Sequence, residues 1–220
     1  MTSYVGLQPE PLGGLSVEHR SRKVLDPTFV PEVGIRAVSL TEAKLRLRVD
    51  TSSEDNDITL SLDAAISWCQ QYTNRQFIRA GYIVTLDDFP RGPIVLDAAP
   101  LVSITTLKYV NTAGTLTTWA SSNYTVDIAS EPGRVFPAYG IDWPEIREPG
   151  AAVQVQYVCG YGTATTDVPN DIRAAILTLT ATLYRNREVW ETSGYAGMTN
   201  PIRLTLESLL SPYVVYRPAL

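Results

Sequence analysis

The segment VPNDIRAAILTLTATLYRNRE, residues 168–188, has the apolar spacing of a long amphipathic helix. Pro169 suits the first turn of such a helix, where the missing N–H of proline costs nothing. The segment contains no His, no Cys and no facing pair of carboxylates. We therefore expect it to close a core and to present a surface. Its apolar stripe consists of Ile172, Ala175, Ile176, Leu179, Leu183 and Tyr184.

Two helices are predicted near the front of the chain. Ser39 and Glu42 have the spacing of a capping box, which satisfies free amides at a helix start. Ser53 is expected to cap the second helix, which should end near Arg75 or Phe77. Leu40, Ala43 and Leu47 lie on one face of the first helix, and Ile58, Leu62, Ala65, Ile66, Cys69 and Tyr72 on one face of the second.

A fourth helix is predicted close to the end of the chain. Asn200 is placed to cap it, Pro201 to occupy its first position and Pro212 to stop it. Its inward-facing residues should be Ile202, Leu206, Leu209 and Leu210.

Between the two helical pairs, from about Ala80 to Cys159, the apolar period changes from 3.6 to 2. Short β-rich runs are separated there by Pro, Gly and Asn, as in NTAG and EPG. The sequence therefore predicts an α+β fold, in which a bundle of about four helices, two N-terminal and two C-terminal, carries an inserted antiparallel β lobe. The expected parts are an extended arm (1–37), a helical core (38–79 with 165–212), the β lobe (80–160) and a tail (213–220).

Composition narrows the class of protein. The chain has 220 residues, 45% of them hydrophobic, and a mean hydropathy of −0.02, as in ordinary globular proteins. Its net charge of −5 and pI near 4.9 disfavour binding that depends on gripping phosphates. Neither an apolar run of about 18 residues nor a secretory signal pattern is visible, so we expect a protein without a membrane segment.

Residues suited to catalysis or metal binding are few. His19 is the only histidine and falls in the predicted arm, which argues against Ser-His-Asp, Cys-His and multi-histidine metal sites. Cys69 and Cys159 are expected to be buried, reduced thiols. Asp87 and Asp88 are the best candidates for an acid–base pair, although no partner is identifiable. We predict no cofactor and no metal.

Two motifs resemble ligand loops only in part. The EDND run at Glu54–Asp57 lacks the Gly and the bidentate Glu of a calcium loop, and it suits the acidic start of a helix better. The glycines of Gly160-Tyr161-Gly162 follow a predicted strand, as in a dinucleotide site. However, Thr165 stands where the third glycine would be.

Aromatic residues cluster in the predicted lobe, at Trp119, Tyr124, Tyr139 and Trp143. Such residues pack small β cores and subunit contacts, and they also stack on sugars. A carbohydrate- or surface-binding module is therefore the main alternative function, and a carboxylate-dependent hydrolase a remote one.

The order of these elements resembles the head–tail connector (adaptor) proteins of tailed bacteriophages and gene transfer agents. The resemblance is carried by SLTEAKLRLRVD, EDNDITLSLDAAISWCQQYTNRQF, VQVQYVCGYG, the helix at 168–188 and LESLLSPY. Together these stretches span residues from about 40 to 212. The arm is longer and the β region larger than the resemblance leads us to expect.

The resemblance implies a non-enzymatic subunit of a virion, assembled in the host cytoplasm. It implies a ring, usually of twelve copies, that docks beneath the portal protein and extends the DNA channel toward a stopper or tail-completion protein. DNA would pass through the lumen without sequence-specific binding, and an acidic lumen would let it slide.

Two segments are predicted to contact other subunits or the portal. The first is the charged end of the helix at 168–188, and the second is the apolar tail, whose removal (213–220) is expected to leave folding intact and to abolish portal binding. A solvated helix end and a tail packed on its own subunit are the alternatives. The residues are Arg185, Arg187, Glu188, Tyr213, Val214, Val215, Tyr216 and Arg217.

Overall fold

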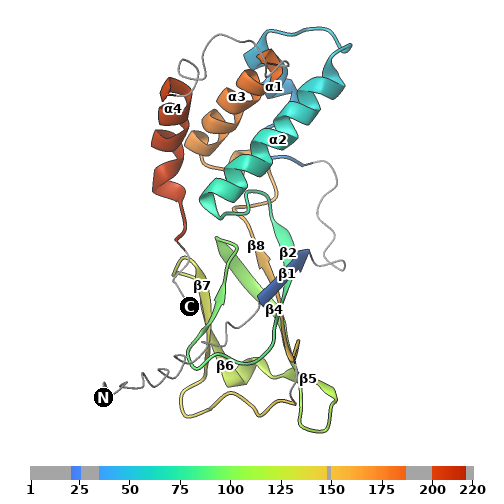
Figure 1. Cartoon of the computed structure of the whole chain (residues 1–220), viewed down its shortest axis with the longest axis vertical. Coiled ribbons are helices and arrows are strands. Elements are labelled where there is room, and N and C mark those ends of the chain that lie inside the picture. Colours follow the sequence, from blue (N-terminus) through green and yellow to red (C-terminus); the bar gives the residue numbers. More distant parts are fainter. Residues whose placement is uncertain (1–20, 26–34, 148–149, 187–199, 217–220) are drawn as a thin grey trace, which may run out of the picture.

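The structure is a computed structural model that describes residues 21–25, 35–147, 150–186 and 200–216. A helical body stands above a β lobe, and the molecule is elongated along the line that joins them (Figure 1). Each part has its own apolar core, one between the helices and one between the sheets. The α+β class and the four helices predicted from the sequence are confirmed.

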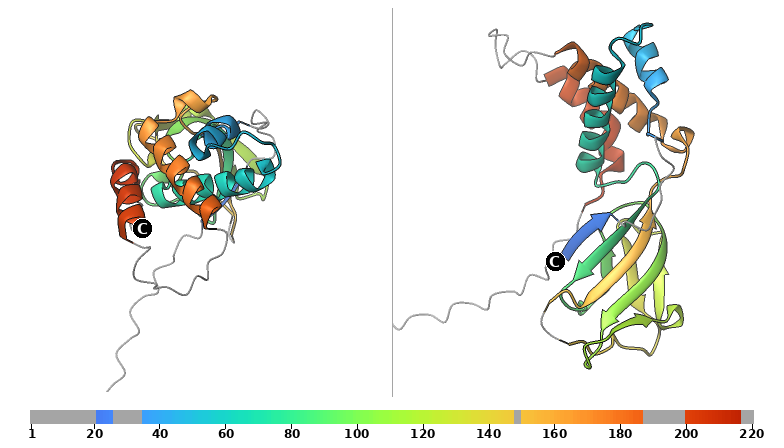
Figure 2. Two further views of the ribbon diagram at one scale, coloured as in Figure 1. Left: turned by 90° about the horizontal axis from the view of Figure 1, so that it is seen from above. Right: turned by 90° about the vertical axis from the view of Figure 1, so that its right-hand side faces the viewer.

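Four α-helices make the body: α1 (Leu40–Leu47), α2 (Asp55–Thr73), α3 (Asn170–Arg185) and α4 (Asn200–Leu210). Helix α3 packs between α4 and α2, and α1 lies against both α2 and α3 (Figure 2). The apolar stripe of α3 is buried at Ile172, Ala175 and Ile176, but Leu183 near its end is 39% exposed. Leu179 and Tyr184 are partly buried and pack against the same core, so Leu183 is the one residue of the predicted stripe that is exposed.

The helix starts show which caps form. At α1 the predicted capping box is present: the Ser39 hydroxyl accepts the Glu42 N–H at 3.2 Å, and the Glu42 carboxylate accepts the Ser39 N–H at 2.8 Å. At α2 the predicted cap is wrong, because Glu54 occupies the N-cap position and makes no side-chain cap bond. The hydroxyl of Ser53 instead lies 3.1 Å from that of Thr51.

The second helix also ends earlier than predicted, at Thr73. Asn74 follows it in the left-handed conformation with φ of 54°. Asn tolerates that conformation better than most residues, so the chain leaves the helix there and turns toward the lobe.

Ion pairs hold the body together from outside its core. Arg36 binds Asp63 on α2 at 2.6 Å, and Lys44 on α1 binds Asp55 at 2.6 Å. Arg173 on α3 pairs with Glu42. Burial alone would raise the pKa of Glu42, but hydrogen bonds from Ser39 and the charge of Arg173 outweigh it and hold the pKa below its usual value.

The lobe is a sandwich of two antiparallel sheets. The larger has the strand order β1-β2-β8-β4-β5 and the smaller the order β3-β7-β6. The strands are β1 (Ser21–Leu25), β2 (Ala80–Leu86), β3 (Ile94–Leu96), β4 (Leu101–Val110), β5 (Leu116–Trp119), β6 (Tyr124–Asp127), β7 (Gly133–Pro137) and β8 (Val153–Cys159). Short 3₁₀ turns lie at Ser121–Asn123, Thr165–Asp167 and Ser211–Tyr213.

Strand β8 is the centre of the larger sheet. It pairs with β2 on one side and with β4 on the other. Its residues alternate as expected for a half-buried strand: Val153, Val155 and Tyr157 are fully buried, and Gln154 and Gln156 are partly exposed.

Strand β1 is where the structure differs from the sequence prediction. Residues 21–25 were expected in an extended arm, yet they pair antiparallel with β2 and form an edge of the larger sheet. The pairing runs from Ser21 opposite Leu86 to Leu25 opposite Tyr82. This edge strand shows no apolar–polar alternation, because neighbouring Lys23 and Val24 are both exposed.

The capping box gives a first test. Replacing Ser39 by Ala removes the hydroxyl that accepts the Glu42 N–H, and we expect the free energy of unfolding to fall by about 1 kcal/mol. Ser53→Ala is the matched control, since Ser53 caps nothing, and it should change stability by less than about 0.5 kcal/mol. Urea unfolding followed by circular dichroism measures both. Equal effects of the two substitutions would contradict the cap assignment.

Candidate interaction site at the junction of body and lobe

Three chain segments meet where the helical body joins the lobe. Residues 75–79, which follow α2, lie beside residues 99–100 on one side and residues 160–162 on the other. Backbone hydrogen bonds connect all three: Gln76 N–H to Ala99 O at 2.8 Å, Arg79 N–H to Gly162 O at 2.8 Å, and Gly160 N–H to Pro100 O at 2.9 Å. The connection is therefore a small hydrogen-bonded unit rather than a loose linker.

The glycines in this unit permit the close approach of two backbones. Gly160 has φ of +124°, and a Cβ placed on it would lie 2.7 Å from the Arg79 Cα. A Cβ on Gly162 would lie 2.0 Å from a carboxylate oxygen of Asp167. The close contacts at Gly160 and Gly162 thus give the Gly-Tyr-Gly motif a structural role at the junction. The partial likeness of this motif to a dinucleotide-binding loop has this structural cause.

Arg75 is the side chain that crosses the junction. Its guanidinium donates to both carboxylate oxygens of Glu131 in the β6–β7 turn, with the Nη1–Oε1 distance at 2.7 Å. It also donates from Nε to the carbonyl of Tyr213 at 2.5 Å and lies 5.8 Å from the centre of the Tyr161 ring. One side chain therefore joins α2, the lobe and the C-terminal segment.

Burial and pairing act in opposite directions on Arg75. Only 8% of its side chain is exposed, and this burial disfavours the charged form. The carboxylate of Glu131 more than compensates, so the pKa of Arg75 lies above its ordinary value. Arg75 is charged at every accessible pH, and the bidentate pair is held in one geometry.

The first part of the C-terminal segment packs on its own chain. The Val215 N–H donates to the Thr73 carbonyl at 3.0 Å, and the Val215 carbonyl accepts from Asn74 Nδ2 at 2.9 Å. Val215 is 3% exposed, whereas Tyr216 is 81% exposed. The Tyr213 hydroxyl donates to Asp171 on α3 at 3.1 Å.

The predicted interface residues are therefore not all alike. Arg185 is exposed at the end of α3, Tyr213 and Val214 are half-buried, and Val215 is buried within its own subunit. The alternative of a tail packed on its own subunit holds as far as Val215. Arg187, Glu188 and Arg217 lie outside the described residues.

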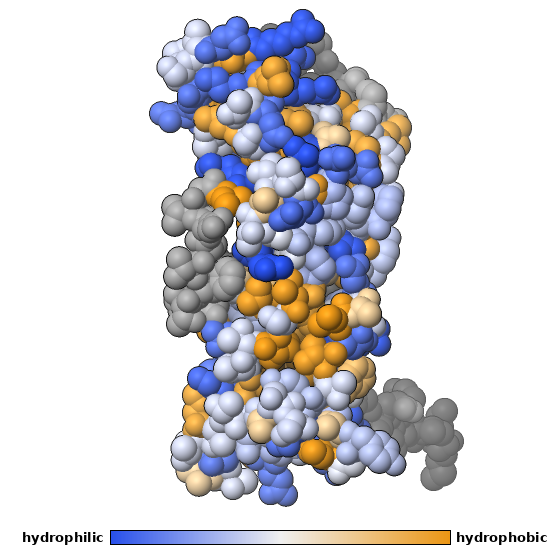
Figure 3. Space-filling view, turned by 180° about the vertical axis from the view of Figure 1, so that it is seen from behind, coloured by the Kyte–Doolittle hydropathy of each residue, from blue (hydrophilic) through white to orange (hydrophobic). Residues whose placement is uncertain are grey.

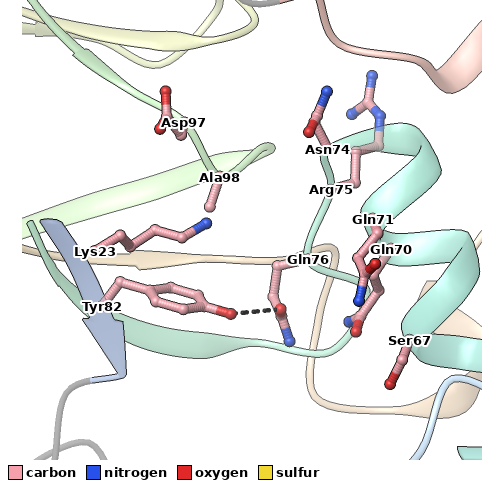
Figure 4. Close-up of a pocket in the computed structure, with 10 residues that line it drawn as sticks. All are labelled: Lys23, Ser67, Gln70, Gln71, Asn74, Arg75, Gln76, Tyr82, Asp97 and Ala98. Carbon is pink, nitrogen blue, oxygen red and sulfur yellow. Dashed lines mark hydrogen bonds between the residues drawn. The ribbon is translucent and has the colours of Figure 1, made fainter. Parts of the chain in front are cut away.

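A polar hollow of about 350 Å³ lies between the end of α2, β1 and the chain near Asp97 (Figure 4). Lys23 lies over the Tyr82 ring at 4.8 Å, and the Tyr82 hydroxyl is bonded to Gln76 at 2.8 Å. Most of the other side chains that line it are amides or hydroxyls, from Ser67, Gln70, Gln71 and Asn74. Among the described residues that line the hollow, Asp97 is the only carboxylate, whereas a hydrolase of this kind uses a pair of them.

The aromatic cluster of the lobe packs mainly on itself. Trp119 is 7% exposed and lies 5.1 Å from Trp143 and 5.8 Å from Tyr124, measured between ring centres. Phe89 stacks on Trp143 at 4.7 Å. Tyr139 is the exception, because it is fully exposed. Three of the four aromatic residues that the sequence offers for sugar binding thus pack in the lobe.

The candidate catalytic groups have structural neighbours. Asp87 accepts the Ala151 N–H at 2.9 Å, and Asp88 accepts the Phe89 N–H at 2.6 Å. Both cysteines are free and buried, and burial raises the pKa of Cys69 and of Cys159 to about 12. Within the described ranges, no group of three or more His, Cys, Asp and Glu side chains is arranged to hold a metal ion.

Hydrophobic and hydrophilic residues are unevenly distributed over the surface. Seen from behind, apolar side chains gather over the lobe just below the helical body, while the far end of the body is mostly hydrophilic (Figure 3). Among the helices of the described part of the chain, none combines the length and apolar character that a membrane span requires.

These features define a class: an α+β protein in which a helical body and a β sandwich are fixed to each other by hydrogen bonds. Comparison with known proteins agrees with this class. Residues 37–113 match the model of the family described as "Phage gp6-like head-tail connector protein". The match covers α1, α2 and strands β2–β4, and it confirms the resemblance that the sequence shows.

Solved structures have the same fold over almost the whole chain. A chain in the neck of an empty gene transfer agent particle, computed with C6 symmetry, is 24% identical with a TM-score of 0.69; 90% of this chain and 97% of that chain are covered. A chain of the virion of a native gene transfer agent particle is 22% identical with a TM-score of 0.67, over 86% and 96%. A chain in the native neck, computed with C12 symmetry, is 24% identical with a TM-score of 0.59, over 84% and 95%. No curated protein matches the chain.

The junction gives a second test. In Gly160→Ala the new Cβ meets the Arg79 backbone, and φ is unfavourable as well, so we expect a loss of about 3 kcal/mol in the free energy of unfolding. Gly92→Ala is the control, because a Cβ there meets nothing within 4 Å. Thermal and urea unfolding measure both variants. A Gly160→Ala protein as stable as Gly92→Ala would show that the two backbones do not approach as described.

Proposed function

We propose that the chain is a structural head–tail connector subunit of a phage-like particle. The observation that carries the proposal is the match of residues 37–113 to the connector family, within a fold that corresponds to neck chains over 90% of its length. In this proposal copies of the chain form a ring, of twelve subunits by analogy with the C12 neck, between the portal protein and a stopper or tail-completion protein. The role is structural and not enzymatic.

The shape of the molecule supports this role. A connector has to touch one component at each end, and here two different parts, a helical body and a β sandwich, form the two ends (Figure 1). The bonds of Arg75 and of the 160–162 segment fix the angle between them. A fixed angle is useful in a ring, because small differences in orientation between subunits prevent closure.

We propose that the chain end beyond Val215 contributes to docking on the portal, together with Arg185, Arg187 and Glu188. Tyr216 is the first residue of the segment whose side chain is free of its own subunit, at 81% exposed, and Arg217 follows it. A short terminal segment of this kind can bind in a partner's groove through its apolar and backbone contacts, which must offset the entropy lost on ordering.

The tail proposal predicts different results for two truncations. Removing 217–220 should leave the free energy of unfolding unchanged and weaken portal binding. Removing 213–220 takes away buried Val215 and the Tyr213 carbonyl, so it should also destabilise the fold by about 1.5–3 kcal/mol or more. Pull-down on the portal protein and urea unfolding separate the two effects. If the chain that lacks only 217–220 bound the portal as well as the full chain does, a docking role for 217–220 would be excluded.

The acidic balance of the chain fits a conduit for DNA. A net charge of −5 disfavours the phosphate contacts that would hold the genome as it passes. We propose that carboxylates line the lumen of the ring; a ring whose lumen proved basic would contradict this.

Deleting the gene from the genome that produces the particle tests the function. If the chain is a connector, electron microscopy should show heads and tails that are separate, and supplying the gene in trans should restore joined particles. Deletion of an unrelated non-structural gene is the control. Joined, infective or transfer-competent particles in the deletion strain would contradict the proposal.

A further inference from the structure

Among the residues that the structure describes, two faces of the helical body are exposed and apolar at their centres. The first, the α2 face, consists of Leu60, Ala64 and Trp68. The second, the α1 patch, consists of Leu45, Arg46 and Arg48. We propose that the α2 face of one copy packs against the α1 patch of the next copy. This inference rests on the proposed ring and names the surfaces that build it.

The α2 face is an apolar stripe on the side of α2 that points away from the core. Its three residues follow each other at intervals of four, so they lie on one side of the helix. Leu60 is 70% exposed and Trp68 is 41% exposed, whereas Ile58, Leu62 and Ala65 on the opposite side are fully buried. An amphipathic helix in a monomer would place polar residues at these outward positions.

Trp68 is held in place before any partner arrives. Its ring stacks on Tyr72 with a distance of 5.2 Å between ring centres and an angle of 11° between planes. An aromatic side chain that is already ordered loses little conformational entropy on binding, and Trp is enriched among the residues that dominate interface energies.

The α1 patch is apolar at its centre and basic around it. Leu45 is 80% exposed, and Arg46 and Arg48 next to it are exposed as well. Arg48 ends α1 in the left-handed conformation with φ of 59°, which turns the chain away beside Leu45. Among the described residues, neither Arg46 nor Arg48 forms an ion pair.

The charges of the two faces are complementary. Helix α2 contains no Lys or Arg, and of its aspartates Asp55 and Asp63 are already paired with Lys44 and Arg36. Asp57 lies one turn before Leu60, at the same side of the helix as the α2 face. Two α2 faces would bring two Asp57 carboxylates toward each other, whereas an α2 face against an α1 patch places Asp57 near Arg46 and Arg48.

The two faces lie on different helices of the body. Helix α1 lies at the edge of the body beside α2 (Figure 2). A contact between different patches is heterologous, so it is repeated from copy to copy and gives a ring when the rotation closes. The body thus has the pair of unlike surfaces that a ring of identical subunits requires.

The experiment measures self-association by sedimentation velocity up to several hundred micromolar full-length chain. Leu60→Ser and Leu45→Ser each remove the apolar centre of one face and change no buried contact, so the folded monomer should be unaffected. We expect each to weaken association at least tenfold. Leu204→Ser is the matched control, because Leu204 is 58% exposed on α4, outside both faces, and it should associate like the wild type.

Mixing the two variants distinguishes the proposed contact from other contacts. A Leu45→Ser chain keeps its α2 face and a Leu60→Ser chain keeps its α1 patch, so an equimolar mixture can form one intact contact per pair. We expect a 1:1 heterodimer with wild-type affinity and no larger species. A mixture that stays monomeric would overturn the pairing of these faces.

The remaining outcomes are also decisive. If the wild type associates and both variants associate equally well, the ring is built through other surfaces and the inference is overturned, while the connector function stands. If the wild type stays monomeric at every concentration, the inference is overturned as well. The connector function is then judged separately, by the phenotype of the gene deletion.

Discussion

The pair between Arg75 and Glu131 is the contact on which the arrangement of the whole molecule depends. The Arg75 side chain is 8% exposed and that of Glu131 is 37% exposed; the pair joins residues 56 positions apart, and the same guanidinium binds the carbonyl of Tyr213. Removing Glu131 would leave the buried charge of Arg75 without its partner, which costs more than the pair itself contributes. The helices and the sandwich each have a core of their own, so this junction decides how the two cores are oriented and not whether they form.

A fixed orientation is the property that a ring of identical subunits demands. If the body and lobe turned freely, each copy would present its two ends at a different angle, and neither the portal side nor the tail side would be regular. The backbone bonds between residues 75–79, 99–100 and 160–162 restrict that rotation, and Gly160 lets the segments come close enough to form them. In the proposed ring the outward residues of α2 and α1 then repeat at constant spacing.

Local patterns predicted the helices and the lobe, because their signals lie within a few residues. The spacing of Ile172, Ala175 and Ile176 predicted α3, and the alternation of Val153, Val155 and Tyr157 predicted β8; the structure buries these residues. Ser53 was the wrong cap because several polar residues in a row compete for that position, and only the three-dimensional turn selects among them. The edge strand β1 could not be predicted because Lys23 and Val24 are both exposed and leave no alternation, and the Arg75–Glu131 pair because its partners lie far apart in the sequence. The tail differs in part from the expectation that it contacts another subunit, because Val215 is buried in its own subunit and bonded to Asn74.

The most direct test that the chain is a connector subunit is native mass spectrometry of the purified protein, alone and with the portal protein of the same particle. Negative-stain images should accompany it. A closed ring of about twelve copies, formed alone or only on the portal, is the predicted result. A monomer that neither forms a ring nor binds the portal would contradict the connector function, and the exposed Tyr139 of the lobe would become the next surface to examine.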